Sequence, residues 1–282
     1  MAAGHITPAL TVHLGVQKTA STALHHLMNR NAARLAGRLT LRTPAPDTPL
    51  RATARAAIDY SLAPSDATRE ALAGAIRRLC DELLATGEAP ILVSHENLPG
   101  AMPGNGGELR LYPHIGAILS LLSEHLAPFA PRFAFYTRDM AAWKKSVYNQ
   151  AVKTDGYPRA REAFEAETAG CGTWDEMRAR AVAAVGEANV AFFALEDEPD
   201  QMRPGQQLLS WAGLTPEEIA ALAPLTYKPN QSLNPGSLEF MRQINRIGLA
   251  PAPRMKVMQL VTRNQALFAP SLAGAEPHGE QR

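Results

Sequence analysis

Four short apolar segments recur along the chain, separated by longer stretches with helical periodicity. They are TVHLGV (11–16), PILVSH (90–95), RFAFYT (132–137) and NVAFFAL (189–195), and RLTLR (38–42) is a weaker fifth candidate. Each is rich in Val, Ile, Leu or Phe and is apolar on both faces. Strands of this kind, alternating with helices, are typical of a parallel sheet covered on both sides.

The stretches between these segments predict helices. The first is marked by Leu24, Leu27, Met28 and Leu35 at helical spacing. A long helix is predicted over 66–87, capped by Asp66 and ended by Gly87. Further helices are predicted over 113–126, 139–153, 173–187, 204–212 and 235–248, the last with Asn234 as N-cap and Pro235 at its first position. The pattern predicts a three-layer α/β fold.

Three segments read as irregular structure. Segment 97–107 is rich in Gly and Pro and follows directly on a strand, 223–235 is a long polar loop, and 270–282 has the composition of a disordered tail. The composition does not shift enough along the chain to require a second domain. We therefore predict a single α/β domain over 1–269, followed by the disordered tail.

The composition is that of a globular protein without a bulk electrostatic preference. The chain has 282 residues, of which 46% are apolar and 20% charged, and its formal net charge is +1. Nucleic acid and anionic membranes are therefore not expected as partners. No uninterrupted apolar run approaches the roughly 18 residues of a membrane span, and the N-terminus does not resemble a secretory signal. We expect a cytoplasmic protein.

Cysteine and histidine spacing gives no reason to expect a metal or a disulfide. Cys80 and Cys171 lie far apart and form no C-x-x-C motif, which suits a reducing cytosol. His25 and His26 are adjacent, so they point to different sides of a helix and are poorly placed to share a metal.

The segment VHLGVQKTASTALHHLM, which begins at Val12, has the pattern of an anion-binding loop. A strand that runs through a tight turn, here Gly15 to Ala20, into a helix leaves backbone N–H groups unpaired, and the helix dipole favours an anion there. Ser21 and Thr22 add hydroxyls, and Lys18 adds a positive charge. The alternative is a capped helix with a surface lysine. The nucleotide-hydrolysing pattern G-x-x-x-x-G-K-[ST] is not matched.

A second strand–helix junction, FAFYTRDMAAWKKSVYNQ (133–150), carries a further candidate anion site. Arg138 lies at the end of the strand, and Ser146 follows about two helical turns later. The carboxyl ends of parallel strands line one crevice, where an Arg suits a phosphate through bidentate hydrogen bonds. The alternative reading is that Arg138-Asp139 caps the helix and Trp143 packs in the core.

Together these motifs resemble the P-loop sulfotransferases that use 3′-phosphoadenosine 5′-phosphosulfate (PAPS), in particular the bacterial branch. Lys18-Thr19-Ala20-Ser21-Thr22 is similar to their 5′-phosphosulfate loop, and Arg138 with Ser146 matches their 3′-phosphate motif. NQSLNPGSLEFMRQINR (230–246) is similar to a C-terminal stretch of the family. The chain departs from the pattern at Ala20, where glycine is common, and at Ala23. Ala is costly at position 20 if the turn needs a positive φ.

The resemblance implies a P-loop-type fold with a central, mostly parallel sheet of about five strands, and PAPS as sulfuryl donor without a metal. It places the cofactor against Gln17, Lys18, Thr19, Ala20, Ser21, Thr22, Arg138 and Ser146, with Lys18 neutralising the leaving group. The catalytic base is Glu96 or His95. The resemblance favours Glu96, whereas an ordinary His pKa near 6.5 favours His95. Because side chains alternate along a strand, we expect only one of the two to face the cofactor.

The acceptor side is left open by the sequence. We expect a hydroxyl or amine of a carbohydrate, lipid or small metabolite, with 97–107 as a lid or acceptor wall. Tyr112, Trp143 and Tyr148 are candidates for stacking on an acceptor or for the core, and Lys228 for the 3′-phosphate or for a solvated surface. The alternatives to a sulfotransferase are a P-loop kinase, which the absent G-K-[ST] disfavours, and a non-catalytic nucleotide-binding module.

Overall fold

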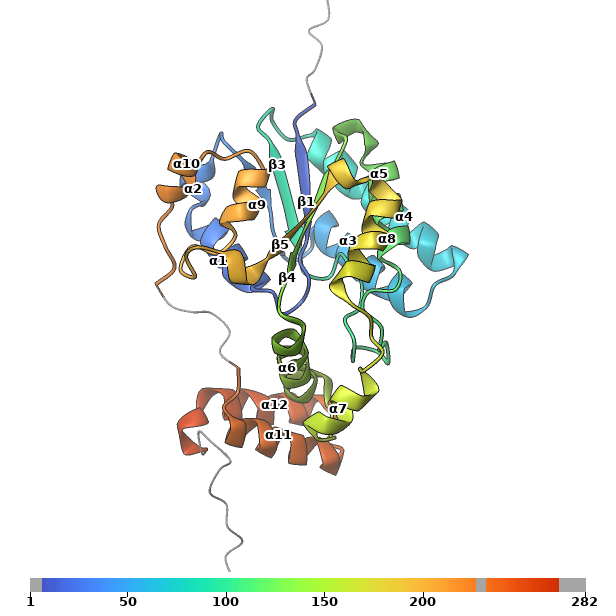
Figure 1. Cartoon of the computed structure of the whole chain (residues 1–282), viewed down its shortest axis with the longest axis vertical. Coiled ribbons are helices and arrows are strands. Elements are labelled where there is room, and N and C mark those ends of the chain that lie inside the picture. Colours follow the sequence, from blue (N-terminus) through green and yellow to red (C-terminus); the bar gives the residue numbers. More distant parts are fainter. Residues whose placement is uncertain (1–6, 227–231, 269–282) are drawn as a thin grey trace, which may run out of the picture. The chain divides into compact units, whose positions relative to one another are not determined.

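A computed structural model describes residues 7–226 and 232–268 of the chain (Figure 1). Within these limits the chain forms two compact units. The first unit is Met1–Trp143 with Gly170–Asn230, and the second is Lys144–Ala169 with Gln231–Arg282. The predicted tail, 270–282, lies outside the described residues.

The first unit is built on a five-stranded sheet in which every pair of neighbours is parallel. The strands are β1 (Leu10–Leu14), β2 (Thr40–Arg42), β3 (Ile91–His95), β4 (Arg132–Thr137) and β5 (Val190–Ala194), in the order β2-β3-β1-β4-β5. All five predicted strands are confirmed, including the weak one at 38–42. Every residue of β1 and β3 is buried, which explains their unbroken apolar sequences.

Helices cover both faces of the sheet, as predicted (Figure 1). One face carries α1 (Ser21–Arg30), α2 (Ala32–Leu35), α9 (Gln206–Trp211) and α10 (Pro216–Ala220), and the other carries α3 (Pro49–Leu62), α4 (Asp66–Leu84), α5 (Ile115–His125) and α8 (Trp174–Val185). Single 3₁₀ turns lie at Ala127–Phe129, Glu187–Asn189 and Leu195–Asp197. On the first face, Leu24 and Met28 of α1 pack in one apolar cluster with Leu208 and Leu209 of α9.

Both ends of α4 differ from the prediction, and helices α3 and α10 of this unit were not predicted. The N-cap of α4 is Ser65 rather than Asp66, because Ser65 and Thr68 form a reciprocal capping box. The helix ends at Leu84, before the predicted stop at Gly87. Helix α3 was not predicted, although Thr48 caps it and Pro49 occupies its first turn, a recognisable start signal.

The second unit is helical. Helix α6 (Met140–Gln150) crosses the boundary between the units and continues as a π-helix, Ala151–Asp155. The unit also contains α7 (Arg161–Glu167), α11 (Pro235–Ile247), α12 (Pro251–Arg263) and a 3₁₀ turn at Gln265–Leu267. Helix α11 begins as predicted, with the Asn234 side chain accepting a hydrogen bond from the Ser237 N–H. Helices α7 and α12 were not predicted.

Carbonyl groups of the π-helix are satisfied by side chains of α11 and α12. Arg254 donates to the carbonyl oxygens of Val152, Lys153 and Thr154 at 2.8, 3.0 and 2.9 Å. Asn245 donates to Val152 at 2.8 Å. These bonds link the two sequence segments of the unit.

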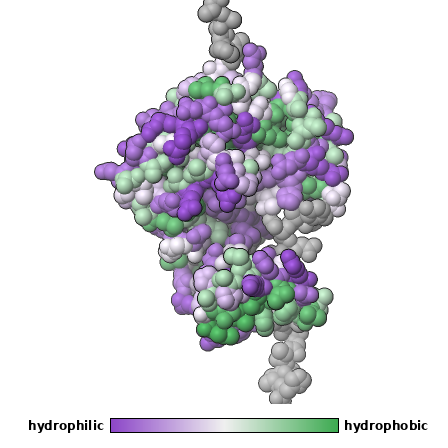
Figure 2. All heavy atoms as spheres, turned by 180° about the vertical axis from the view of Figure 1, so that it is seen from behind, coloured by the Kyte–Doolittle hydropathy of each residue, from purple (hydrophilic) through white to green (hydrophobic). Residues whose placement is uncertain are grey.

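The surface of the second unit includes large apolar side chains (Figure 2). Ile247 and Leu260 are 69% and 62% exposed. Among the described helices, none is both long enough and apolar enough to cross a bilayer. Cys80 and Cys171, both in the first unit, are buried free thiols, in agreement with the absence of C-x-x-C spacing.

Candidate active site at the carboxyl ends of three strands

The loop after β1 and the end of β3 lie against each other, with β4 on the other side of β1. The Gly15 N–H donates to the His95 carbonyl at 3.1 Å, which extends the β1–β3 pairing beyond the strands. A Cβ atom at Gly15 would lie 3.2 Å from the Cα atom of Glu96, closer than side chains ordinarily approach a backbone. Glycine at position 15 therefore lets the loop that contains Lys18 pass close to the backbone of Glu96 at one edge of the sheet.

The Lys18 loop has a strained backbone. Lys18 and Ala20 both have positive φ angles, 70° and 65°, and neither is a glycine. A non-glycine residue in the left-handed region costs about 1–2 kcal/mol and persists only where the surroundings impose it. The departure at Ala20 noted in the sequence is thus a real cost. Such strain is concentrated at functional sites.

Hydrogen bonds of the Thr19 and Gln17 side chains hold this loop. The Thr19 hydroxyl donates to the Val16 carbonyl at 2.6 Å and closes the turn. The Gln17 side chain donates to the Asn97 side chain at 3.1 Å and to the Gly100 carbonyl at 3.3 Å. The side chains of Gln17 and Thr19 are therefore engaged within the protein, and they position the loop.

Two aromatic residues complete this support. The Trp143 indole N–H donates to the Gln17 carbonyl at 2.9 Å, and the Tyr112 hydroxyl donates to Gln17 Oε1. Each of the two is only 1% exposed. Of the two alternatives for these residues, acceptor stacking or core, the core reading is therefore the right one. Tyr148, in the second unit, is also buried and packs with Tyr157 and Phe164, and Lys228 lies outside the described residues.

The first turn of α1 presents donors for an anion. Ala20 is its N-cap and provides no side-chain cap. Among the described residues, the N–H groups of Ser21, Thr22 and Ala23 have no hydrogen-bond partner, nor do the hydroxyls of Ser21 and Thr22. Unpaired N–H groups at the positive end of a helix dipole favour a bound anion.

Arg138 lies at the end of β4, as predicted, and is partly exposed. Its carbonyl oxygen accepts a hydrogen bond of 2.7 Å from the Trp174 indole. Its guanidinium forms no hydrogen bond or ion pair with any described residue. Asp139, by contrast, does cap α6, since its carboxylate accepts from the Ala142 N–H at 2.8 Å. The capping alternative therefore explains Asp139 and leaves Arg138 available for a ligand.

Ser146 lies on α6, within the second unit, and is partly exposed. Within the described part of the chain, its hydroxyl has no hydrogen-bond partner. The eight-residue spacing from Arg138 thus places Ser146 on the predicted helix, and its role toward a 3′-phosphate stays a prediction.

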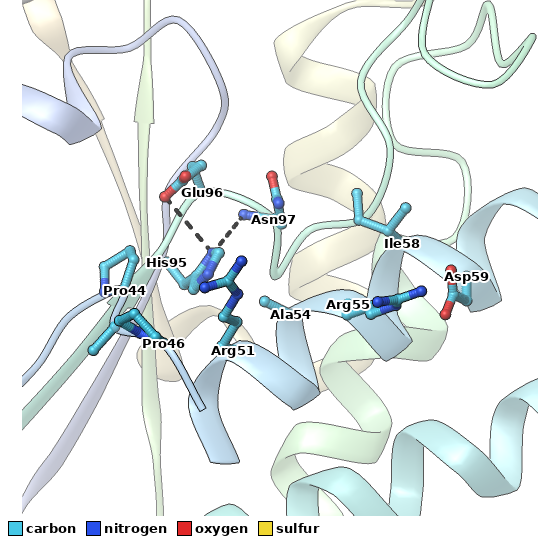
Figure 3. A pocket seen from close by; sticks show the side chains of 11 residues that line it. Pro44, Pro46, Arg51, Ala54, Arg55, Ile58, Asp59, His95, Glu96 and Asn97 are labelled. Carbon is cyan, nitrogen blue, oxygen red and sulfur yellow. Dashed lines mark hydrogen bonds and ion pairs between the residues drawn. The ribbon is translucent and has the colours of Figure 1, made fainter. Parts of the chain in front are cut away.

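His95 and Glu96 line the same pocket (Figure 3). Strand β3 ends at His95, so Glu96 lies in the following turn and the alternation of a strand does not separate the two side chains. Glu96 Oε2 lies 3.6 Å from His95 Nδ1. The expectation based on alternation therefore does not apply, because Glu96 is not part of the strand.

The hydrogen bonds around His95 distinguish the two candidate bases. The Asn97 backbone N–H donates to His95 Nδ1 at 3.1 Å, so this nitrogen is an acceptor and the neutral ring carries its proton on Nε2. Burial, together with the charge of Arg51, lowers the pKa of His95 despite the opposing effect of Glu96. The single lone pair of a neutral His95 is therefore occupied. Glu96 Oε2 is buried and, among the described residues, receives no hydrogen bond.

At Ser94, the residue before His95 in β3, two buried histidines lie within hydrogen-bonding distance of the same hydroxyl. The sequence did not suggest this arrangement. His13 Nδ1 and His25 Nε2 each lie 2.8 Å from Ser94 Oγ. Burial, with a smaller contribution from His25, lowers the pKa of His13 to about 3, and burial lowers that of His25 to about 4. Both rings are therefore neutral near pH 7 and link α1 to β1 and β3.

The environments of the two adjacent histidines differ as predicted. His25 is buried, whereas His26 is exposed on the other side of α1. Within residues 7–226 and 232–268, no group of three or more His, Cys, Asp or Glu side chains is placed to hold a metal ion.

A pocket of about 540 Å³ opens beside Glu96. Its lining comes from three segments, Pro44–Pro46, helix α3 and His95–Asn97, and the α3 residues are Arg51, Ala54, Arg55, Ile58 and Asp59 (Figure 3). The volume lies within the usual range of small-molecule sites. The sequence prediction missed this wall because it missed α3.

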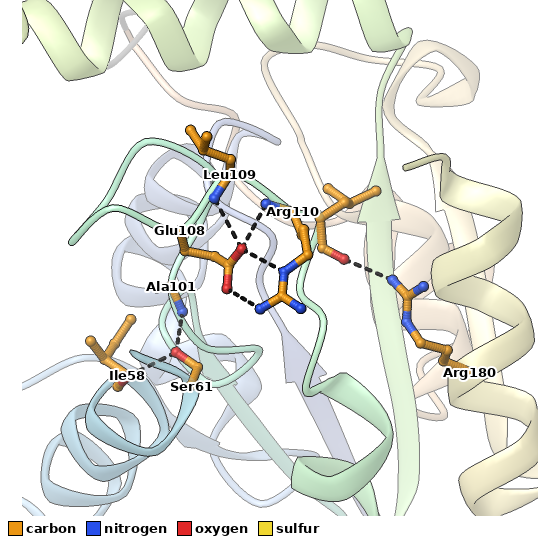
Figure 4. A network of polar contacts seen from close by, with 8 residues as sticks. Ile58, Ser61, Ala101, Glu108, Leu109, Arg110 and Arg180 are labelled. Atoms are coloured by element: carbon orange, nitrogen blue, oxygen red, sulfur yellow. Dashed lines mark hydrogen bonds and ion pairs between the residues drawn. The ribbon is translucent and has the colours of Figure 1, made fainter. Parts of the chain in front are cut away.

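Segment 97–107 is a fixed wall over its first half. Residues 98–103 are buried, and the Ala101 N–H donates to the Ser61 hydroxyl of α3 at 2.8 Å (Figure 4). The segment that follows is held at Glu108, whose carboxylate accepts from the Leu109 and Arg110 N–H groups at 2.9 and 2.8 Å (Figure 4). Gly100 in this half leaves no room for a side chain, because a Cβ atom there would lie 2.7 Å from Ser61 Cβ.

Comparison with known proteins gives one structural similarity. The chain is similar to the crystal structure of a sulfotransferase from Alicyclobacillus acidocaldarius, with a TM-score of 0.46 and 11% sequence identity over 92% of this chain and 97% of that one. No protein-family model and no curated protein sequence matches the chain.

Proposed function

We propose that the protein is a sulfotransferase that moves a sulfuryl group from PAPS to a hydroxyl of a small-molecule, carbohydrate or lipid acceptor. The observation that carries this proposal is the strained Lys18–Ala20 turn, which opens α1 from a loop whose Gly15 lies against the backbone of Glu96. Among the described residues, Glu96 Oε2 receives no hydrogen bond. An anion site and a candidate base thus share one edge of the sheet.

The donor half of the site suits a nucleotide with two separate anionic groups. The first-turn N–H groups of α1, with the hydroxyls of Ser21 and Thr22, suit the 5′-phosphosulfate. Arg138, unpaired among the described residues, suits the 3′-phosphate. Ser146 is the second residue that the sequence motif implies for this phosphate. Lys18 supplies positive charge in the same turn as the helix N-terminus. When bound, PAPS supplies the sulfuryl group and a bisphosphate leaving group.

The chain's own residues then have distinct roles in the transfer. Glu96 accepts the proton of the acceptor hydroxyl as its oxygen forms a bond to sulfur. The bond from sulfur to the bridging phosphate oxygen breaks, and Lys18 stabilises the negative charge that develops there. His95, whose Nδ1 accepts from the Asn97 N–H, keeps its proton on Nε2. Gln17, Thr19 and Trp143 keep the loop in the required conformation.

Binding of the donor product tests the first half of the proposal. Adenosine 3′,5′-bisphosphate should raise the melting temperature of the protein without added metal. ATP with magnesium is the control ligand for the kinase alternative. Stabilisation by ATP only when magnesium is present, with no effect of the bisphosphate, would indicate that the protein is a kinase rather than a sulfotransferase.

Transfer of ³⁵S-labelled sulfuryl groups to a panel of hydroxyl and amine acceptors tests the second half. The Lys18→Ala variant should lose at least about 10²-fold in turnover, the effect of removing one preorganised charge-stabilising group. Bisphosphate binding without transfer to any acceptor would indicate a nucleotide-binding module. Unchanged turnover in Lys18→Ala would refute the mechanism.

A further inference from the structure

The pocket beside Glu96 has an unusual distribution of charge on its α3 wall. Arg51 and Arg55 are four residues apart, so they lie on the same face of the helix, about one turn from each other. Both are exposed, and neither side chain forms a hydrogen bond or ion pair with any described residue. Among the described residues, nine other arginines do pair with a carboxylate.

Two like charges at this spacing disfavour each other, and a bound anion would relieve the repulsion. Arg51 lies next to the reactive pair, because its charge acts on His95 (Figure 3). Arg55 lies farther along α3, toward Asp59 (Figure 3). The order along the pocket is therefore base, first arginine, second arginine and then a carboxylate.

Apart from Asn97, the rest of the lining is apolar. Pro44, Ala45 and Pro46 form one side, and Ala54 and Ile58 of α3 lie between the charged residues. Such a surface suits the carbon skeleton of a ligand, whereas the arginines suit a planar or tetrahedral anion through their forked donors. The combination selects a molecule with an apolar body and one acidic group.

We propose that this pocket binds an acceptor that carries a carboxylate, sulfate or phosphate group, which Arg51 and Arg55 hold while the acceptor hydroxyl lies at Glu96. This inference rests on the proposed function, since it takes Glu96 as the base. It narrows the acceptor class to hydroxyl compounds with an apolar body and one acidic group, such as aryl glucuronides or hydroxy fatty acids. The reaction is unchanged: the hydroxyl oxygen gains the sulfuryl group and its proton passes to Glu96.

Matched pairs of acceptors test this proposal. 4-Nitrophenyl β-D-glucuronide is paired with the glucoside, and 12-hydroxydodecanoic acid with 1,12-dodecanediol, so that a carboxylate in the acidic member replaces a CH₂OH group in the neutral member. Binding to the full chain is measured by calorimetry with adenosine 3′,5′-bisphosphate present, and transfer is measured with labelled PAPS. At least one acidic member should bind at least about 10-fold more tightly than its neutral partner and react correspondingly better.

Three variants test whether the preference for the acidic acceptor comes from the pocket residues rather than from the overall charge of the protein. Arg51→Gln and Arg55→Gln should each remove most of the preference for the acidic over the neutral acceptor, whereas Asp59→Asn should increase it. Arg78→Gln is the matched control, because Arg78 is an exposed helical arginine on α4 and has no ion pair among the described residues. It should leave the preference unchanged. None of the four should alter bisphosphate binding.

The outcomes distinguish this proposal from the one on which it rests. If the bisphosphate binds but acidic and neutral partners bind and react alike, or no acidic member binds, the pocket assignment is wrong and the sulfotransferase proposal stands. A preference that survives Arg51→Gln also overturns the assignment. If the bisphosphate fails to bind, the proposed function fails, and binding of the acidic members alone still decides whether the pocket holds an anion.

Discussion

The indole nitrogen of Trp143 donates a hydrogen bond of 2.9 Å to the backbone carbonyl of Gln17. Trp143 belongs to the helix that follows β4, and Gln17 to the loop that follows β1. The start of α6, the helix that follows Arg138, therefore also supports the Lys18 turn. One buried side chain thus links the two strand–helix junctions that we propose bind PAPS.

Replacing Trp143 by Phe should weaken nucleotide binding through this link. The variant keeps an aromatic ring but leaves the Gln17 carbonyl without its hydrogen-bond donor, which costs about 1–3 kcal/mol. We expect a corresponding loss of stability and about a 10-fold weaker affinity for adenosine 3′,5′-bisphosphate, measured by chemical unfolding and calorimetry.

Trp211→Phe is the matched control for this prediction. The Trp211 indole nitrogen is buried and has no hydrogen-bond partner among the described residues, so the substitution removes ring area without breaking a hydrogen bond. It should leave bisphosphate affinity unchanged. Equal loss of affinity in both variants would show that the Trp143–Gln17 bond does not shape the site.

The strain at Ala20 predicts that Ala20→Gly stabilises the protein. Glycine adopts a φ of 65° without the cost that Ala pays, about 1–2 kcal/mol, and it loses about 0.4–1 kcal/mol through the entropy of the unfolded chain. The expected net gain is about 0.5–1 kcal/mol by chemical unfolding. The control, Ala71→Gly in the exposed interior of α4, should instead lose about 1 kcal/mol. Destabilisation by Ala20→Gly would show that the turn is not strained.

The sequence predicted the sheet, and it placed the Lys18 turn and Arg138 at strand ends, because both depend on local patterns. Strands buried on both faces have unbroken apolar sequences, and the Lys18 turn and Arg138 follow such strands directly. The strand ends then meet because parallel neighbours align their carboxyl ends. The Ala20 strain was also foreseeable, since glycine is the usual residue for such a turn.

The pocket beside Glu96 was not predictable by the same reasoning. Its wall depends on α3, whose Arg51 and Arg55 look like ordinary solvated charges until the helix is placed beside Glu96. The roles of Gln17 and Tyr112 depend on a hydrogen bond between residues 95 positions apart. The alternation argument at His95 and Glu96 failed because it required the end of β3 to within one residue, and element ends are the least certain part of a sequence prediction.

The buried histidines predict a loss of stability in mild acid. His13 and His25 have folded-state pKa values of about 3 and 4, well below the ordinary 6.5 of the unfolded chain. Between pH 6.5 and 4 the unfolded state therefore binds more protons, and stability falls as the pH falls. Each histidine contributes up to about 1.4 kcal/mol per pH unit in this window.

Urea unfolding at pH 7.5, 6 and 5 measures this dependence. The variant His25→Gln should be less stable than wild type at pH 7.5 but should lose less stability between pH 7.5 and 5. His26→Gln, which changes the exposed neighbour, should follow the wild-type dependence. A wild-type protein equally stable at pH 7.5 and 5 would contradict the burial of neutral histidines.

Arg138→Ala should weaken binding of adenosine 3′,5′-bisphosphate at least about 10-fold, because a bidentate contact to phosphate is lost. Stability should change little, since the guanidinium has no hydrogen bond or ion pair among the described residues. The comparison of adenosine 3′,5′-bisphosphate with adenosine 5′-monophosphate by calorimetry isolates the 3′-phosphate. Wild type should discriminate between them and Arg138→Ala should not. Retained discrimination would rule out Arg138 as the 3′-phosphate ligand.

The hydrogen bond from Asn97 to His95 predicts which of the two neighbouring residues is the base. His95 Nδ1 accepts from the Asn97 N–H at 3.1 Å, so a neutral His95 has no free lone pair, whereas Glu96 Oε2 receives no hydrogen bond among the described residues. Glu96→Gln should therefore lower transfer by about 10²–10⁴-fold, the usual contribution of a general base, with donor affinity unchanged. His95→Gln should lower it less. In the pH dependence of kcat/KM, the limb that reports the base should disappear in Glu96→Gln and persist in His95→Gln. The reverse order of effects would transfer the role of base to His95, and would require the Asn97–His95 bond to open during the reaction.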